Sequence, residues 1–205
     1  NNRGQSLRKS VDRLFLDTQY SHFINPTMRW FAGANFLSQF APGFSFTPGG
    51  ERISLISALF APAFLSEAIG LESKPQKYLA VQLGGGTIRQ TFVLNDRVLA
   101  EQFNRGEARY GVPFGQRVLN ELGIQGVVAF DKDIAKNVNL KWRYQAFFAY
   151  APVAKPVDHL INLVAAAKVN KNLNVNFSLI AIYDQDQAAQ VQISQGLAAG
   201  LSFQL

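Results

Sequence analysis

The last stretch of the chain, Val191–Leu205, alternates between apolar side chains and small or polar ones. Successive residues of a β-strand point to opposite faces, so this alternation predicts a strand with one apolar and one polar face. An ordinary soluble strand has about 5–6 residues, whereas a tilted strand that crosses a bilayer needs about 9–11. The length of the pattern therefore favours the closing strand of a transmembrane β-barrel.

The composition of the 205 residues agrees with this interpretation without establishing it. The mean hydropathy of +0.01 is too low for a helical membrane protein, and no apolar run reaches the roughly 18 residues of a spanning helix. A β-barrel interleaves polar and apolar residues and so has a near-neutral average, as a soluble all-β domain would. The absence of Cys excludes disulfides and thiolate metal sites.

The same reasoning predicts about nine strands in an antiparallel, all-β transmembrane barrel that forms a single domain over residues 1–205. The weakest strand is Ile53–Leu65, because it is apolar on both faces and contains Pro62, which cannot donate to a ladder. The other predicted strands are Val11–Ile24, Thr27–Phe46, Lys77–Val93, Leu119–Asp131, Asn137–Ala151, Val157–Val169, Leu173–Asp184 and Val191–Leu205.

The predicted connections differ in length between the two ends of the strands. If the last strand ends in the periplasm, the short turns are periplasmic and the long segment Asn95–Arg117 is external, as outer-membrane barrels require. Bacterial single-chain barrels have even strand numbers, so we expect one or three strands before Asn1 and about ten to twelve in the complete protein, or an error at Ile53–Leu65. The predicted short turns are Asn25-Pro26, Leu71–Gln76, Lys132–Lys136 and Asn170–Asn172.

The polar face of the last strand carries only Gln, Ser, Gly and Ala, whereas a soluble exterior would be rich in Lys, Glu and Asp. Small neutral residues suit a crowded interior, so we assign the polar faces to the barrel lumen and the apolar faces to lipid. The lumen-facing candidates are Arg29, Glu121, Lys141, Arg143 and Gln145. The lipid-facing or aromatic-belt candidates are Trp30, Trp142, Tyr144, Phe148, Tyr150, Phe177, Leu201 and Phe203.

Several short segments occur in a recognisable order, namely Ala61–Ala63, Ala68–Leu71, Lys74-Pro75, Gly86–Val93, Lys168–Leu173 and Tyr183-Asp184. With the Gly-rich last strand, this order resembles a family of uncharacterised outer-membrane proteins from Bacteroidota, known mainly as a domain of unknown function. The resemblance runs from about Arg8 onward and implies further N-terminal strands. The last strand also resembles the recognition signal of barrel-assembly machinery, although Leu205 stands where a terminal Phe is usual.

The sequence does not favour an enzyme, a cofactor or a metal site. The two His residues are His22 and His159, and Asp158 beside His159 would point to the opposite face of a strand. No spacing of His, Asp or Glu matches a metal site, and a solvated loop is the better interpretation of Asp184 and Asp186. The net charge of +6 comes from scattered Lys and Arg residues, which does not indicate a nucleic-acid partner.

The resulting hypothesis is a non-enzymatic, integral β-barrel protein of the bacterial outer membrane that serves as a structural subunit or scaffold of an envelope complex. Its expected partners are outer-membrane lipid, lipopolysaccharide and other envelope proteins. A narrow porin-like channel is the first alternative, since side chains such as Arg143 and Gln145 could plug a small barrel. A soluble ligand-binding β-barrel and a membrane-embedded hydrolase are the remaining ones.

Overall fold

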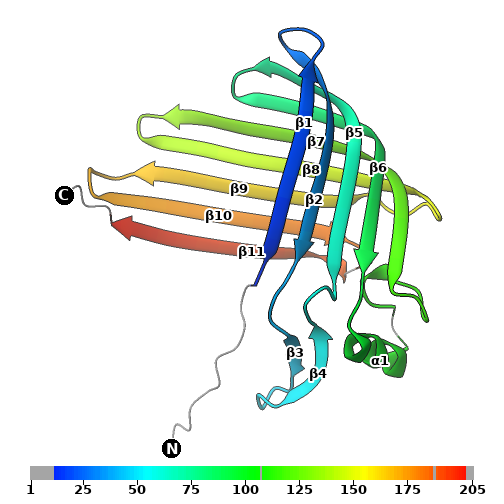
Figure 1. The fold of residues 1–205 in the computed structure, drawn as a ribbon. Helices are drawn as coiled ribbons and strands as arrows, with labels where there is room; N and C mark the ends of the chain where they lie inside the picture. Colours follow the sequence, from blue (N-terminus) through cyan, green and yellow to red (C-terminus); the bar gives the residue numbers. More distant parts are fainter. Residues whose placement is uncertain (1–11, 107, 187, 202–205) are drawn as a thin grey trace, which may run out of the picture. The chain divides into compact units, whose positions relative to one another are not determined.

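The computed structural model describes residues 12–106, 108–186 and 188–201, and its main element is an antiparallel sheet of nine strands (Figure 1). Each strand pairs with its neighbours in sequence, apart from the insertion of a separate two-stranded sheet between β2 and β5. The nine strands are β1 (Leu14–Phe23), β2 (Met28–Ser38), β5 (Ala63–Gln76), β6 (Leu79–Phe92), β7 (Val118–Ala135), β8 (Val138–Ala151), β9 (Asp158–Lys168), β10 (Leu173–Asp184) and β11 (Ala188–Leu201).

The remaining elements lie in the two longest connections. The two-stranded sheet consists of β3 (Gly43–Phe46) and β4 (Arg52–Ser57), and helix α1 (Asp96–Arg105) and the 3₁₀ turn η1 (Arg109–Gly111) lie between β6 and β7. No helix in the described part of the chain is long and apolar enough to cross a membrane. The predicted all-β class and the large antiparallel sheet are confirmed. In the described residues the sheet is open, with β1 and β11 as its edge strands.

Two predictions for the segment from Ile53 to Gln76 are wrong, one of a strand and one of a turn. The predicted strand Ile53–Leu65 is divided, because Phe60 adopts a positive φ of 55° and the chain reverses direction between β4 and β5. The predicted turn Leu71–Gln76 is part of β5, where the N–H of Lys74 donates to the carbonyl of Thr27 at 2.7 Å. The charged residues of this segment, Glu72 and Lys74, lie on one face of β5, and the actual turn follows at residues 77–78.

Two further boundaries differ from the prediction. The segment Thr27–Phe46 forms β2 and then β3, with a break at residues 39–42. The predicted turn Lys132–Lys136 is shorter, because β7 continues to Ala135 and pairs there with Val138 of β8. Asn137 closes that turn with φ of 66°, a conformation that Asn tolerates better than most residues.

The connections at one end of the strands are all short, and we call it the short-turn end; it holds residues 24–27, 77–78, 136–137 and 169–172. At the opposite ends of the strands, which we call the long-connection end, the connections 39–62, 93–117 and 152–157 are longer, whereas the one between Asp184 and Ala188 is also short. Asn side chains form two of the short turns, as Asx turns require. The Oδ1 of Asn25 accepts from the N–H of Met28 at 2.8 Å, and the Oδ1 of Asn170 accepts from the N–H of Leu173 at 2.9 Å.

The chain divides into two compact units. Unit 1 comprises residues 1–18, 34–67 and 89–120, and it contains both long connections. In unit 1 the Oδ1 of Asn95 caps α1 by accepting from the N–H groups of Arg97 and Val98. Tyr110 of η1 donates its hydroxyl to the carbonyl of Ile56 at 2.8 Å. The two connections thus share one apolar core, formed by Ala58, Ala61, Val93, Val98, Val112 and Leu119.

Unit 2 comprises residues 19–33, 68–88 and 121–205, and its strand register defines two faces. On one face, cross-strand pairs join Phe130 with Trp142 and Trp142 with Leu163. The same face continues into the pair of Phe177 with Leu197. We call it the apolar face. The opposite side, the polar face, carries nearly all charged residues of these strands, because side chains alternate between faces.

Candidate functional site

The polar face of unit 2 collects four of the residues that the sequence singled out. Lys141 lies opposite Asp131, and Arg143 follows two residues later on the same side of β8. Gln145 donates an amide hydrogen to the Oε1 of Gln125 at 3.3 Å. Glu121 lies on the same side of β7 as Gln125, and both side chains are buried. The register therefore places the predicted lumen residues of β7 and β8 on one common face.

A buried ion network centres on Glu72 of β5. Its carboxylate is only 2% exposed and accepts two N–H groups from the guanidinium of Arg29, of which the Nε–H lies at 2.9 Å. The other carboxylate oxygen, Oε2, accepts a hydrogen bond from the side chain of Gln82 at 2.7 Å and one from the side chain of Gln19 at 3.3 Å. The Nζ of Lys74 lies 3.4 Å from Oε1. Because a buried carboxylate is costly unless it is paired and hydrogen-bonded, this network fixes four strands against one another. The sequence prediction missed Glu72 because it placed that residue in a turn.

A second ion network, which we call the Lys155 cluster, lies at the long-connection end of unit 2. The Nζ of Lys155 is 2.8 Å from the Oε1 of Glu121 and 2.5 Å from the Oδ2 of Asp186. Burial alone would lower the pKa of Lys155, but hydrogen bonds to Asp186 and Glu121 outweigh it and raise the pKa above its usual value. Glu121 is 1% exposed, so Lys155 neutralises an almost fully buried carboxylate. Asp186 also donates its N–H to the side chain of Asp184, which holds Asp186 next to the end of β10.

The apolar face of unit 2 is exposed, although it carries the larger hydrophobic side chains. Leu83 is 59% exposed, Leu201 70% and Leu197 76%. Trp142, Tyr144 and Phe148 share this face, because they pair with Phe130, Val128 and Ile124 of β7. Tyr150, Phe177 and Leu201 from the predicted lipid-facing set are exposed as well. Phe203, also predicted to face lipid, lies outside the described residues.

Aromatic rings gather near the short-turn end of unit 2. Tyr20 and Trp30 lie with their ring centroids 5.3 Å apart. The Phe130 ring lies 5.6 Å from the Tyr78 ring and stacks on the Trp142 ring at 5.7 Å. Trp30 is adjacent in sequence to Arg29, so it projects to the side opposite the Glu72 network. These rings therefore form a band at one end of the apolar face.

Neither His residue lies in an arrangement typical of a hydrolase. His22 lies beside the ring of Trp30, with the centroids 6.3 Å apart. His159 stacks on Tyr144, whose hydroxyl lies 2.7 Å from the Nδ1 of His159, and its other side faces Tyr183. A hydrolytic base would need a nucleophile on one ring nitrogen and an orienting carboxylate on the other. Within the described ranges, no three His, Asp or Glu side chains converge as metal ligands.

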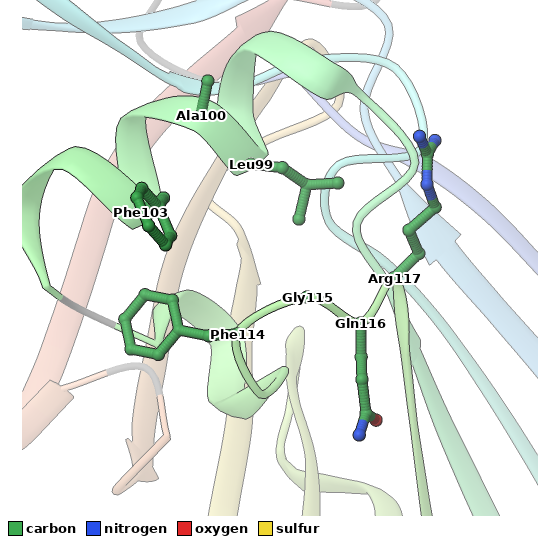
Figure 2. Close-up of a pocket in the computed structure, with 7 residues that line it drawn as sticks. All are labelled: Leu99, Ala100, Phe103, Phe114, Gly115, Gln116 and Arg117. Atoms are coloured by element: carbon green, nitrogen blue, oxygen red, sulfur yellow. The ribbon is translucent and has the colours of Figure 1, made fainter.

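A shallow pocket of about 310 Å³ lies in unit 1, between α1 and the segment that leads into β7. Figure 2 shows Phe103 of α1 and Phe114 of that segment pointing toward one another, with Leu99 directed into the space between the two segments. The rings of Phe103 and Phe114 meet edge to face at 6.2 Å. Arg117 at the margin is paired with Asp96 at 2.5 Å, so the pocket carries little net charge.

Comparison with family models, curated proteins and solved structures gave no match. The resemblance to an outer-membrane family of Bacteroidota therefore stays a prediction from the sequence. A functional proposal therefore rests on the geometry of each unit.

Proposed function

We propose that this protein is an integral β-barrel of the bacterial outer membrane that serves as a non-enzymatic structural subunit of an envelope complex. The observation that carries the proposal is the inverted polarity of unit 2. Its polar face buries Glu72 and Glu121, while its apolar face exposes residues such as Leu83 and Leu201. A soluble sheet has the opposite arrangement, with the apolar face in the core and the charges in water.

The energetic cost of this arrangement in water supports a lipid environment. Exposed apolar surface costs about 25 cal/mol per Å², and soluble monomers rarely expose contiguous apolar patches larger than a few hundred Å². The apolar face extends over five consecutive strands, β7 to β11, so its exposure to water would be strongly unfavourable. Contact with lipid chains removes that cost.

Two further features match outer-membrane barrels. Short turns connect the strands at one end, three of the four connections at the other end are longer, and an aromatic band lies near the short-turn end. Closure of the sheet is part of the proposal, because unpaired edge groups of β1 and β11 would cost several kcal/mol each in hydrocarbon. Both edge strands run from the long-connection end to the short-turn end, so a strand antiparallel to both would close the barrel and make its strand number even.

The role as a structural subunit is supported by unit 1 and by the histidines. The long connections pack around a common core that includes Val98 and Val112, which gives the protein a fixed surface rather than flexible loops. Such a surface suits contact with envelope proteins, and lipid and lipopolysaccharide would surround the strands. His22 lies beside the ring of Trp30, and His159 is hydrogen-bonded to Tyr144 and lies between two aromatic rings, an arrangement that suits a structural role.

A narrow porin-like channel is the second candidate, and the charged residues of the polar face favour it. Arg29, Lys141 and Glu121 would line the lumen of the barrel and could contact small solutes. Paired charges fill much of that face, as in the Glu72 network, so the channel would be narrow.

Membrane fractionation of the full-length protein tests the proposal. An integral barrel resists extraction by alkaline carbonate and by urea, requires detergent for release, and migrates faster in SDS gels before boiling than after. A protein that is released by carbonate and stays monodisperse without detergent would be a soluble β-domain, and the proposal would be wrong. Size measurement of the complex in mild detergent then tests the subunit role.

A further inference from the structure

The four turns of the short-turn end all belong to unit 2 and lie side by side. Three of them accept a backbone hydrogen bond from the strand beside them, donated by Lys74 to Thr27 at 2.7 Å, by Asp131 to Tyr78 at 2.9 Å and by Lys168 to Asn137 at 2.8 Å. Each donating strand runs on into the next turn. The four turns therefore form one continuous border of unit 2.

This border is rich in exposed lysines, which we call the lysine border. Five exposed lysines lie in the turns or within three residues of them, namely Lys74, Lys77, Lys136, Lys168 and Lys171. The acidic residue within the same distance is Asp133, whose carboxylate accepts a hydrogen bond from Asn139 at 3.1 Å. Lys74 is paired with Glu72, but in the described part of the chain the other four lysines form no ion pair. The lysine border thus presents an unbalanced positive charge.

The opposite ends of the same strands carry acidic residues instead. β9 begins at Asp158, β10 ends at Asp184, and Glu121 lies close to the start of β7. The ammonium of Lys155 is used there to neutralise Glu121. The charges of unit 2 are therefore separated along the strands, with the positive excess at the short-turn end.

Another lysine connects the lysine border to the aromatic band of the apolar face. The Nζ of Lys132 lies 4.4 Å from the centre of the Tyr78 ring. That ring lies beside Phe130, which stacks on Trp142. Aromatic rings of such a band lie at the headgroup level of a membrane, and lysines beside them extend their ammonium groups toward the polar layer.

We propose that the lysine border binds the phosphate groups of anionic phospholipids. This inference rests on the proposed membrane barrel and names the lipid that surrounds one end of it. The exposed ammonium groups complement the charge of the phosphates, and the adjacent aromatic band sets them at headgroup level. Outer-membrane barrels have their short turns on the periplasmic side, where the leaflet is phospholipid rather than lipopolysaccharide.

Tryptophan quenching in vesicles of the full-length protein tests this proposal. Phosphatidylglycerol and phosphatidylcholine brominated at the same chain positions differ only in the headgroup, and Trp142 lies close enough to the lysine border to report which lipid is bound there. We expect phosphatidylglycerol to associate about fivefold more strongly with the wild type, roughly the contribution of one lysine near an anionic surface. Raising the salt from 0.1 M to 1 M shortens the screening length from about 10 Å to about 3 Å and should remove most of this preference.

Three matched variants assign the preference to the lysine border. Lys136→Gln/Lys168→Gln/Lys171→Gln removes three charges from adjoining turns and should reduce the preference to less than about twofold. Replacement of the same three lysines by Arg keeps the charges and should keep the preference. The third variant lowers the net charge equally in the two long connections and should leave the preference unchanged; it is Arg52→Gln/Arg97→Gln/Arg117→Gln.

A wild type without a preference for phosphatidylglycerol would overturn the proposal, as would a preference that the Lys→Gln variant retains or that the Arg→Gln variant loses to the same extent. If the Lys→Gln variant does not insert, the salt series on the wild type decides, because a preference that persists at high salt is not electrostatic. Lipopolysaccharide that displaces phosphatidylglycerol from the wild type would assign the lysines to sugar phosphates of the outer leaflet, contrary to the proposal.

Carbonate resistance, measured on every variant, separates this proposal from the proposed barrel. Loss of membrane integration in the wild type contradicts the barrel itself. Normal integration without a lipid preference contradicts only the binding of anionic phospholipids at the lysine border.

Discussion

Arg29 and Glu72 form a buried ion pair in which one guanidinium donates two N–H groups to one carboxylate oxygen. The two residues come from β2 and β5, which are adjacent in the sheet although the two-stranded insertion separates them in sequence. Gln19 and Gln82 from the flanking strands complete the network. Around Glu72, the polar face of unit 2 is thus buried and hydrogen-bonded.

Removal of Arg29 should destabilise the protein far more than removal of Lys74. Arg29→Met leaves the Glu72 carboxylate buried without its main partner, which costs about 3–5 kcal/mol. Lys74 is half exposed, so Lys74→Met should cost at most about 1 kcal/mol. Urea unfolding in lipid vesicles, followed by tryptophan fluorescence, measures both values.

The double variant Arg29→Met/Glu72→Met is the control for that comparison. It removes both charges together, so much of the stability lost in Arg29→Met should return. Equal losses in Arg29→Met and Lys74→Met would show that the Glu72 carboxylate is solvated, contrary to the structure.

The sequence predicted the large antiparallel sheet because alternation is a local property that each strand shows by itself. The error at Leu71–Gln76 arose because Glu72 and Lys74 look like loop residues until Arg29, distant in sequence, is placed beside them. The Lys155 cluster could not be predicted for the same reason, since its three residues come from one strand and two connections that are far apart in sequence. Helix α1 did have a local signal, because Asn95-Asp96 before Val98 is typical of a helix start.

The core of unit 1 should depend on Val98 rather than on the exposed rings of the pocket. Val98→Ala removes two methyl groups from a fully buried position, which should cost about 2 kcal/mol through lost transfer energy and the cavity left behind. Phe103→Ala should cost much less, because the Phe103 ring is 73% exposed.

Limited proteolysis of the membrane-inserted protein measures this difference. Val98→Ala should increase the rate of cleavage within residues 93–117, and Phe103→Ala should leave it close to the wild-type rate. Faster cleavage in Phe103→Ala than in Val98→Ala would show that the pocket, and not the buried cluster, maintains the fold of unit 1.

The contribution of Lys155 to stability should vanish at alkaline pH. The folded protein holds the pKa of Lys155 above its unfolded value of 10.5, so the contribution is fully present below about pH 10.5 and is lost as the pH rises through the folded pKa. The difference in unfolding free energy between the wild type and Lys155→Met should therefore be constant from neutral pH to about pH 10 and then decrease. A difference that decreases already between pH 7 and 9 would assign the effect to another group.

The two tryptophans report directly on which face of unit 2 meets lipid. Trp30 and Trp142 are the only Trp residues of the chain and lie near the short-turn end. If that end marks a membrane interface, lipids brominated close to the carbonyl should quench both emissions more than lipids brominated at the chain end. Trp30→Phe and Trp142→Phe separate the two signals.

Phe114→Trp in the variant that lacks both native tryptophans is the control. Its emission should escape both quenchers, because Phe114 lies in the connection before β7. Native tryptophans that neither lipid quenches would place the apolar face out of contact with hydrocarbon and so contradict the barrel.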